Sequence, residues 1–264
     1  MRTLLTNSGT GKIYASALAM RELGFKRVLF LVHRVTLAKQ AKKSFEKVFD
    51  KKVTMGLVGA GFYEYEKDYV FATVETLNRD THLFQYQPNA FDCIILDEAH
   101  HSSNNIYTKV INYFNPKLFL GMTATPDKRD DNQEGKNIYE IFHYQIAHEI
   151  RLQQAMEDNL LCPFHYFGIS EVISLDDKTL QATKLTDDEF NQLTSDERVR
   201  HVIEQSEYYG YSGDRVKGLV FCSRVKECEE LSRKFNALGY RTIALSGNDS
   251  EEKRQAAFER LAMD

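Results

Sequence analysis

The sequence lacks any hydrophobic run that approaches the roughly 20 residues needed to cross a membrane. Its N-terminal residues are apolar only briefly before the first glycines, which argues against a signal peptide. It has only four cysteines, and none of them lies in a close pair with the spacing of metal ligands: Cys93, Cys162, Cys222 and Cys228. We therefore expect free thiols in a reducing, cytoplasmic environment.

The chain also lacks a strong excess of either charge, since its net charge is −4. This balance excludes a protein that is basic over its whole surface, as a nucleic-acid coat would be, but it allows a local basic track. The lysine-rich run over residues 39–52 is interpreted as the solvated face of a helix. The sequence contains no internal repeat of short period and no low-complexity tract.

A glycine-rich turn that ends in lysine follows the first short apolar segment, with the sequence Ser8-Gly9-Thr10-Gly11-Lys12. Successive backbone N–H groups at a helix N-terminus bind phosphate, and a lysine in this place reaches the β- and γ-phosphates. Two positions depart from the full phosphate-loop pattern: Thr6 stands where a glycine is expected, and Ile13 where Ser or Thr is expected. An ordinary strand–turn–helix without a ligand stays open as the alternative for this segment.

Two adjacent carboxylates, Asp97 and Glu98, follow an apolar segment over residues 93–96. Asp97 is placed to hold a magnesium ion, and Glu98 to orient and deprotonate an attacking water. Further polar side chains that are candidates for coupling to this site are His100, Thr123 and Thr125. An isolated Asp-Glu pair is more often part of a solvated loop, and only the combination with Lys12 makes a nucleotide site the favoured interpretation.

Short apolar runs alternate with amphipathic stretches along the first half of the chain. Continuous hydrophobicity predicts strands that are covered on both faces, and intervening helices predict a parallel, doubly wound sheet. Ligands of such sheets bind beyond the carboxyl ends of the strands. The expected strands cover residues 28–32, 53–58, 69–73, 93–96 and 118–121, and the expected helices cover residues 14–23 and 37–49.

The second half is expected to start near residue 155, which gives domains over residues 1–155 and 156–264. We expect a polar surface loop over residues 127–137, a helix over 146–159 and an extended aromatic segment over 163–173. Further expected helices cover residues 202–209, 225–238 and 250–263, and expected strands cover 218–222 and 241–245. An independent α/β domain needs more strands than this half of the chain provides, so we expect the second domain to be incomplete.

Six short segments, in the order in which they occur along the chain, resemble the motifs of superfamily 2 helicases and translocases of the DEAH-box kind. The resemblance is greatest to the bacterial group related to restriction-enzyme motor subunits. The segments that carry the resemblance over most of the chain are 8–12, 31–34 with Gln40, 71–77, Asp97-Glu98-Ala99-His100, 121–126 and 220–224. The resemblance implies two RecA-like doubly wound domains in tandem. It also implies ATP and Mg²⁺ as cofactors, with Ser8 to Ile13 around the phosphates.

The resemblance further implies a track for a nucleic-acid strand, with DNA favoured over RNA, and contacts that do not depend on base sequence. The candidates for this track are Arg34, Thr73, Thr76, Arg79 and Arg224. The aromatic segment over residues 62–65 has two interpretations, a platform for bases or, as we prefer, a hairpin or loop that packs on the sheet. Translocation polarity, oligomeric state and appended domains stay open.

The family's last two motifs are expected beyond residue 264, so the chain is interpreted as a fragment that is a poor ATPase by itself. Isoleucine at position 13 has no donor atom, and we expect weak magnesium binding and slow hydrolysis from this change. The alternative function is a nucleotide- or nucleic-acid-binding module that does not hydrolyse ATP. The carboxylates at 97 and 98 argue against this alternative.

Overall fold

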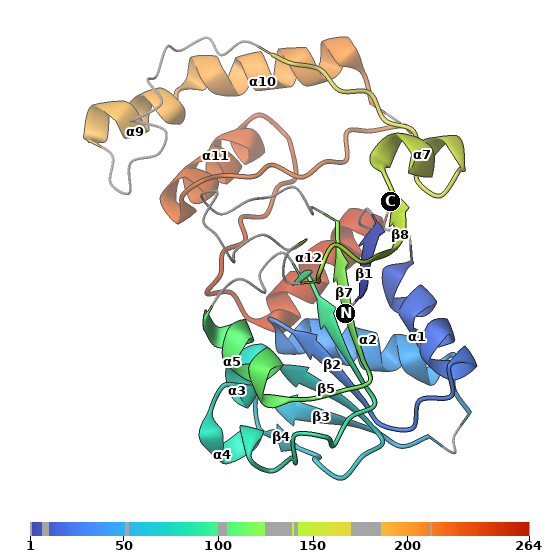
Figure 1. Ribbon diagram of the computed structural model, residues 1–264. Coiled ribbons are helices and arrows are strands. Elements are labelled where there is room, and N and C mark those ends of the chain that lie inside the picture. The colour runs from blue at the N-terminus through green and yellow to red at the C-terminus, as the bar shows by residue number, and fades with distance from the viewer. Residues whose placement is uncertain are drawn as a thin grey trace. The chain divides into compact units, whose positions relative to one another are not determined.

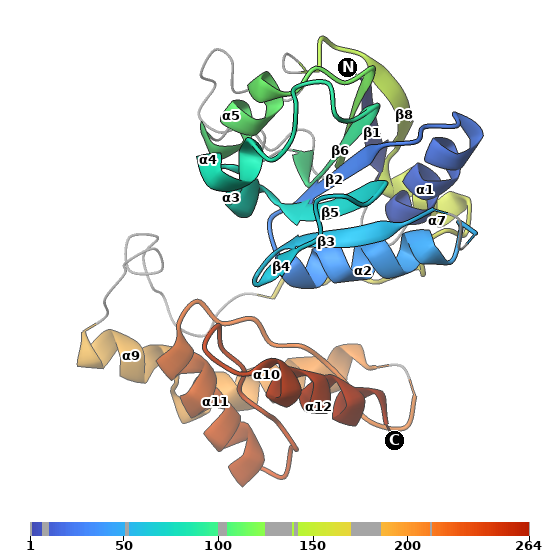
Figure 2. The same cartoon turned by 90° about the horizontal axis from the view of Figure 1, so that it is seen from below.

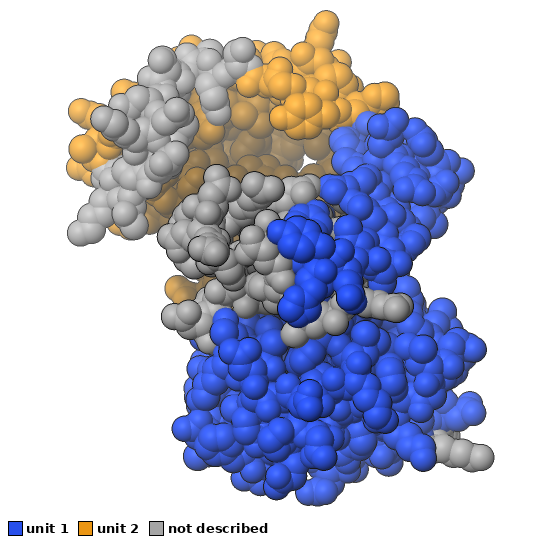
Figure 3. Space-filling view, viewed as in Figure 1, with its two compact units in different colours: residues 1–164 blue, residues 165–264 orange. Residues whose placement is uncertain are grey.

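The computed structural model describes residues 2–6, 11–50, 53–99, 105–124, 139, 142–169, 186–211 and 213–263. The chain divides into two compact units, residues 1–164 and 165–264, which Figure 3 distinguishes by colour. Within the described part of the chain, no helix has both the length and the apolar character needed to span a membrane.

The first unit is built on one sheet of eight strands in the order β4-β3-β5-β2-β6-β7-β1-β8 (Figure 1). All strand pairs are parallel except β3 and β4, which form an antiparallel hairpin. The prediction of an α/β fold with a mainly parallel sheet is therefore confirmed for this unit. The strands are β1 (Arg2–Thr6), β2 (Val28–Val32), β3 (Met55–Gly59), β4 (Phe62–Tyr63), β5 (Tyr69–Thr73), β6 (Cys93–Asp97), β7 (Leu118–Thr123) and β8 (Ile146–Ile150).

Helices cover both faces of this sheet, as Figure 2 shows. Helices α1 (Lys12–Glu22) and α2 (Val35–Glu46) lie on one face, where their buried side chains join those of β2 and β5 in one core cluster. On the other face lie α3 (Val74–Leu77), α4 (Asp80–Leu83) and α5 (Asn105–Tyr113), which contribute to a second core cluster. A sheet covered in this way buries alternate side chains in two separate cores.

The central strands explain why continuous hydrophobicity predicted the sheet well. All five residues of β2 and all five of β5 are buried. On the α2 face, Phe45 packs edge-on against Phe30 and Phe71, at ring-centroid distances of 5.5 and 5.2 Å. Edge-to-face contacts of this kind add to the stabilisation that comes from burying the apolar area.

The segment over residues 146–159, predicted as one helix, is instead a strand followed by a short helix. Residues Ile146–Ile150 form β8, which pairs in parallel with β1, and α7 covers Leu152–Glu157. The stretch Ile146-Ala147-His148-Glu149-Ile150 has too little helical periodicity to override an available sheet edge. The prediction of a helix was wrong for its first five residues, because the unpaired edge of β1 offered main-chain hydrogen bonds.

The second unit contains four described helices, whose starts follow local rules. They are α9 (Asp187–Leu193), α10 (Asp196–Tyr209), α11 (Val225–Ala237) and α12 (Glu251–Ala262). Thr186 and Glu189 form a capping box at the start of α9. The hydroxyls of Ser195 and Ser250 accept a hydrogen bond from a backbone N–H in the first turn of α10 and α12. Caps of this type satisfy N–H groups that have no partner inside the helix.

The two strands predicted in this unit do not form in the described structure. Residues 218–222 and 241–245 have no assigned strand, and three side chains of the first segment are largely exposed: Leu219 (64%), Val220 (62%) and Phe221 (91%). The prediction of these two strands was wrong. A strand forms only when its backbone N–H and C=O groups are hydrogen-bonded to a neighbouring strand, whereas a helix makes most of these hydrogen bonds within itself.

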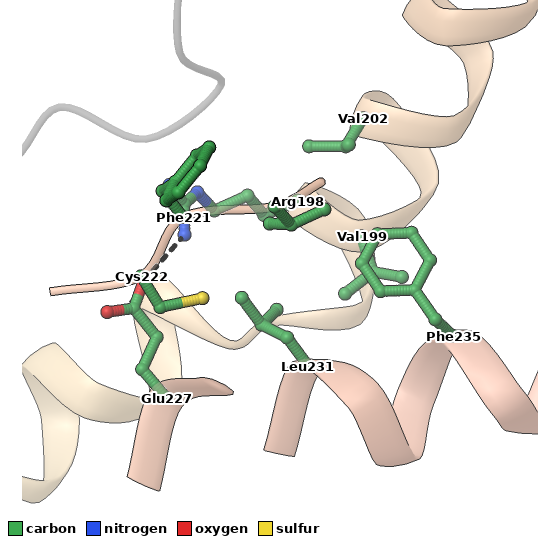
Figure 4. Close-up of a pocket in the computed structure, with 9 residues that line it drawn as sticks. Arg198, Val199, Val202, Phe221, Cys222, Glu227, Leu231 and Phe235 are labelled. Atoms are coloured by element: carbon green, nitrogen blue, oxygen red, sulfur yellow. Dashed lines mark hydrogen bonds and ion pairs between the residues drawn. The ribbon is translucent and has the colours of Figure 1, made fainter. Parts of the chain in front are cut away.

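A small pocket of about 60 Å³ lies beside the exposed segment, between residues of α10 and α11. Figure 4 shows Cys222 directed toward Leu231, while Phe221 turns away from Leu231 and Phe235. One wall carries the ion pair of Arg198 Nη1 and Glu227 Oε1, at 3.5 Å. The pocket is mainly apolar, and the ion pair is the main polar feature among its lining residues.

Candidate functional site

The candidate site residues of the first unit gather along the carboxyl edge of the sheet. Strands β1, β6 and β7, which stand close together in the sheet order, lead to Lys12, Asp97 and Thr123. Strands β5 and β2, neighbours of each other, lead to Thr73 and Arg34. The topology therefore separates the candidates for a nucleotide from those for a nucleic acid along one edge, as expected for an open α/β sheet.

The start of α1 provides the first component of the candidate nucleotide site. Gly11 stands at the N-cap with φ +81°, a left-handed conformation that a glycine adopts without strain. Lys12 is the first helical residue, and its Nζ lies 3.9 Å from Glu98 Oε1. This buried ammonium has no hydrogen-bond acceptor in the described structure. Residues Ser8, Gly9 and Thr10 lie outside the described residues.

The two carboxylates differ in their surroundings. Asp97 is buried, with 8% of its surface exposed, and its Oδ1 accepts a hydrogen bond of 3.1 Å from the backbone N–H of Glu98. Burial raises the pKa of Asp97 first, the adjacent Glu98 carboxylate raises it further, and the Lys12 ammonium opposes both. Glu98 has φ +50°, a left-handed conformation that costs free energy in a non-glycine residue and directs the chain out of the strand.

Carboxylate oxygens are the ligands that Mg²⁺ prefers, and a buried ammonium without an acceptor suits a phosphate. Asp97 and Lys12 therefore fit a magnesium–nucleotide complex in their chemistry. Ile13 does not add a ligand: its side chain is partly buried and packs against the core cluster on the α1 face. In the described part of the chain, no group of three His, Cys, Asp or Glu side chains forms a separate metal centre.

Thr123 ends β7 and is fully buried, and β7 pairs with both β6 and β1. Thr123 therefore lies on a strand between β1, which precedes the lysine in the sequence, and β6, which leads to the two carboxylates. The other candidates for coupling, His100 and Thr125, lie outside the described residues.

Tyr107 on α5 is a residue near the carboxylates that the sequence did not single out. Its side chain is buried, and its hydroxyl has no hydrogen-bond partner in the described structure. Burial raises the pKa of Tyr107 to about 12, and the charges of Asp97 and Glu98 raise it in the same direction. Because the chain has 14 tyrosines and no motif marks this one, only the fold reveals it.

The candidates for a nucleic-acid track begin with two threonines at the end of β5. The hydroxyls of Thr73 and Thr76 share a hydrogen bond of 2.8 Å. Gly59, at the end of β3, lies so close that a Cβ there would be 3.0 Å from both hydroxyl oxygens. Sequence reasoning missed Gly59, although a glycine at a strand end is a signal of close approach. Arg34 is exposed at the N-cap of α2.

The other two basic candidates have different settings. Arg79 is exposed, with its Nη2 at 3.5 Å from Glu75 Oε1 on the same surface. Arg224 belongs to the second unit, at the N-cap of α11. The structure therefore brings the two threonines together and places the three arginines on separate elements.

Comparison with known proteins gives this geometry a family context. Residues 3–128 match the family model ResIII, described as "Type III restriction enzyme, res subunit". The chain is 28% identical over 205 residues to IRC3 of Saccharomyces cerevisiae, named as a candidate ATP-dependent helicase, and the match covers 71% of this chain and 28% of that protein. It is 24% identical over 258 residues to the Type I restriction enzyme EcoAI endonuclease subunit of Escherichia coli, covering 87% of this chain and 31% of that protein.

Among solved structures, the chain is similar to the ATP-dependent Type ISP restriction-modification enzyme LlaBIII bound to DNA. The TM-score is 0.59 at 19% identity, and the match covers 92% of this chain and 20% of that chain. At this identity the likeness concerns the fold. The chain thus shares its fold with this enzyme, is similar in sequence to a helicase and to a restriction-enzyme subunit, and spans less than a third of the length of these two curated relatives.

Proposed function

We propose that this chain is part of an ATP-dependent motor that moves on nucleic acid, with its nucleotide site at the carboxyl ends of β1, β6 and β7. One observation carries the proposal. The buried Lys12 ammonium lacks a hydrogen-bond acceptor and lies 3.9 Å from Glu98, next to the buried Asp97. A lysine and two carboxylates at one sheet edge are the groups that phosphoryl transfer to water requires.

Each residue has a distinct role in this proposal. Lys12 binds the β- and γ-phosphates, together with the backbone of residues 8–11. Asp97 holds Mg²⁺, which when bound neutralises charge on the phosphates. Glu98 orients the attacking water and accepts its proton. Thr123, with His100 and Thr125, is proposed to couple the nucleotide site to movement, because β7 pairs with both β6 and β1.

In the first unit, the carboxyl ends of β2 and β5 and the residues that follow them are proposed to hold the nucleic-acid backbone through Arg34, Thr73, Thr76 and Arg79. Arg224, in the second unit, is proposed as a separate contact with nucleic acid. Hydroxyl and guanidinium donors bind phosphates irrespective of base sequence. DNA is the proposed track, because the relatives include restriction enzymes and the similar solved enzyme is bound to DNA. We place the chain in the DEAH-box group on the sequence Asp97-Glu98-Ala99-His100.

The second candidate function is a nucleotide- or nucleic-acid-binding module without hydrolysis. The observation that favours it is Ile13, which packs against the core where a hydroxyl is expected to ligate magnesium. In the motor proposal, the same residue slows hydrolysis without abolishing nucleotide binding. The two functions therefore differ in turnover rather than in binding.

The test is hydrolysis of labelled ATP under single-turnover conditions, which detects slow chemistry, with and without single- and double-stranded DNA and RNA. We expect slow hydrolysis that DNA accelerates, and a rate constant about 10²- to 10⁴-fold lower in Glu98→Gln, because the general base is lost. Nucleotide binding without hydrolysis in any of these mixtures would establish the binding module instead.

Ile13→Thr sharpens the same experiment. We expect this variant to hydrolyse ATP faster than the parent, because the new hydroxyl adds a ligand for magnesium. An unchanged rate would remove the explanation that position 13 limits hydrolysis. Ile13→Val is the matched control, since it shortens the side chain without adding a donor.

A further inference from the structure

The turn between β3 and β4 places an aromatic ring at the edge proposed for nucleic acid. Gly59 pairs with Phe62 across the hairpin. The three residues from Gly59 to Gly61 all have positive φ, at +134°, +47° and +89°, so the chain reverses within a very short turn. Phe62 is thereby fixed beside the carboxyl end of β3 instead of being carried away on a long loop.

This end of β3 is also where the chain approaches the two threonines. The Cα of Gly59 faces the hydroxyls of Thr73 and Thr76, and no side chain stands between them. Gly59 and Thr73 are buried and Thr76 is partly exposed, so a phosphate or sugar can approach this cluster from the side of Thr76. The hairpin register therefore puts Phe62 next to the cluster of Gly59, Thr73 and Thr76, of which Thr76 is partly exposed.

Phe62 itself is only partly covered by protein. Its side chain is 39% exposed, and Lys39 Nζ on α2 lies 5.1 Å from the centre of its ring. Lys39 is exposed, and within the described residues no carboxylate forms an ion pair with it. A partly exposed aromatic ring with a cation beside it has the composition of a single-strand platform.

We propose that Phe62 stacks on an unpaired base of a nucleic-acid strand whose sugar-phosphate backbone passes Thr76, the partly exposed residue of the cluster with Gly59 and Thr73. Lys39 is carried on a flexible stem, so its ammonium can leave the ring for the phosphate next to the stacked base. The inference rests on the proposed function and narrows its substrate. A ring at a protein surface stacks only on a base that is free of its partner strand, so this edge selects single-stranded over double-stranded nucleic acid.

Tyr63 provides a matched control on the same strand. It is 56% exposed, and its ring stacks on His82 of α4, with centroids 5.4 Å apart and planes 5° apart. Adjacent strand residues point to opposite faces, and the contacts confirm this: Phe62 faces α2 and Tyr63 faces α4. The two residues are similar in type and exposure, but only Phe62 lies on the face of Lys39.

The experiment measures binding of labelled oligonucleotides to the 264-residue chain and to Phe62→Leu and Tyr63→Leu. The probes are a single strand, a duplex of the same sequence and an abasic single strand of equal length. We expect Phe62→Leu to weaken binding of the normal single strand about fivefold or more, because base–aromatic stacking is lost. Its effect on the duplex and the abasic strand should be less than about twofold, since neither offers a base to stack.

Thermal unfolding of both variants checks that the hairpin is intact. If Phe62→Leu binds the normal strand as well as the parent does while Arg34→Ala binds it more weakly, the stacking proposal is wrong and the nucleic-acid track survives. An equal loss with Tyr63→Leu, or with the abasic strand, also overturns stacking. If the parent binds none of the probes, the proposed function fails and this inference fails with it.

Discussion

The two units of this chain differ in how their apolar segments are covered. In the first unit, β2 and β5 lie inside an eight-stranded sheet, and every one of their residues is buried. In the second unit, residues 218–222 are equally apolar in sequence, but Leu219, Val220 and Phe221 are largely exposed. Hydrophobicity therefore favours the burial of a segment, while hydrogen bonding to a neighbouring strand decides whether the segment becomes a strand.

The helices of the two units do not differ in this way, since helices form in both. Helices α9 to α12 form in the second unit with side-chain caps at three of their starts. A helix satisfies most of its backbone groups internally, so a local sequence is enough to define it. Four predictions test whether the two units differ in stability as this contrast implies.

The largest effect is expected from Phe30→Ala in the first unit. Phe30 is fully buried and packs against Phe45 and Phe71, so the substitution leaves a cavity between them. We expect a loss of about 3–5 kcal/mol in the free energy of unfolding of this unit. Urea unfolding followed by circular dichroism measures it, and a loss below about 1 kcal/mol would show that this core is loosely packed.

A smaller loss is expected from Arg198→Met in the second unit. The substitution removes the partner of Glu227, whose side chain is buried and whose other oxygen has no hydrogen-bond donor among the described residues. An unpaired buried carboxylate should cost about 1–3 kcal/mol. Arg200→Met, at an exposed position of the same helix, is the control and should change stability by less than about 0.5 kcal/mol. Equal effects of the two variants would contradict a structural role for the ion pair.

Asp97→Asn is expected to stabilise the first unit in a pH-dependent way. Burial raises the pKa of Asp97 in the folded state, so the carboxyl binds its proton more tightly when folded than when unfolded. The protonated Asp97 carboxyl therefore contributes favourably to folding at pH values below its pKa in the unfolded state. This contribution is lost as the pH rises through its pKa in the folded state. The variant should therefore melt at a higher temperature than the parent near neutral pH, and this advantage should disappear on acidification. A gain that is independent of pH would contradict a penalty for burying the charge.

The smallest effect is expected from Phe221→Ala. With 91% of its surface exposed, this side chain loses little contact on truncation, and we expect a change within about 0.5 kcal/mol. Hydrogen exchange provides a second measurement, in which amides of residues 219–221 should exchange far faster than those of β2. Slow exchange at residues 219–221 would show that this segment is paired and that the contrast between the units is wrong.

The sequence predicted the sheet of the first unit well, because its central strands are continuously apolar and need no special turn to define them. The predicted strands over residues 28–32 and 69–73 have the observed bounds. The helix predicted over residues 146–159 failed, since only the sheet order reveals that β1 has an open edge for β8. The strands predicted in the second unit failed for the converse reason, the lack of a paired neighbour in the described structure.

The candidate site was predictable where chemistry follows a strand directly. Lys12, Asp97 and Thr123 all lie at the same edge, because parallel strands end together. Tyr107 and Gly59 were not predictable, since their importance comes from contacts between segments that are distant in sequence. The bounds 1–155 and 156–264, and the roles of Ser8, Gly9, Thr10, His100 and Thr125, stay predictions.

Equilibrium binding of ATP with Mg²⁺ to the parent chain, to Lys12→Ala and to the control Lys26→Ala tests whether this sheet edge binds nucleotide. Lys26 is exposed and does not lie among the site residues. If the carboxyl ends of β1, β6 and β7 form a nucleotide site, the parent and Lys26→Ala should bind alike, and Lys12→Ala should bind at least tenfold more weakly, on the order of 1.4 kcal/mol or more. Equal binding by all three proteins, or no binding by the parent, would contradict a nucleotide site at this edge.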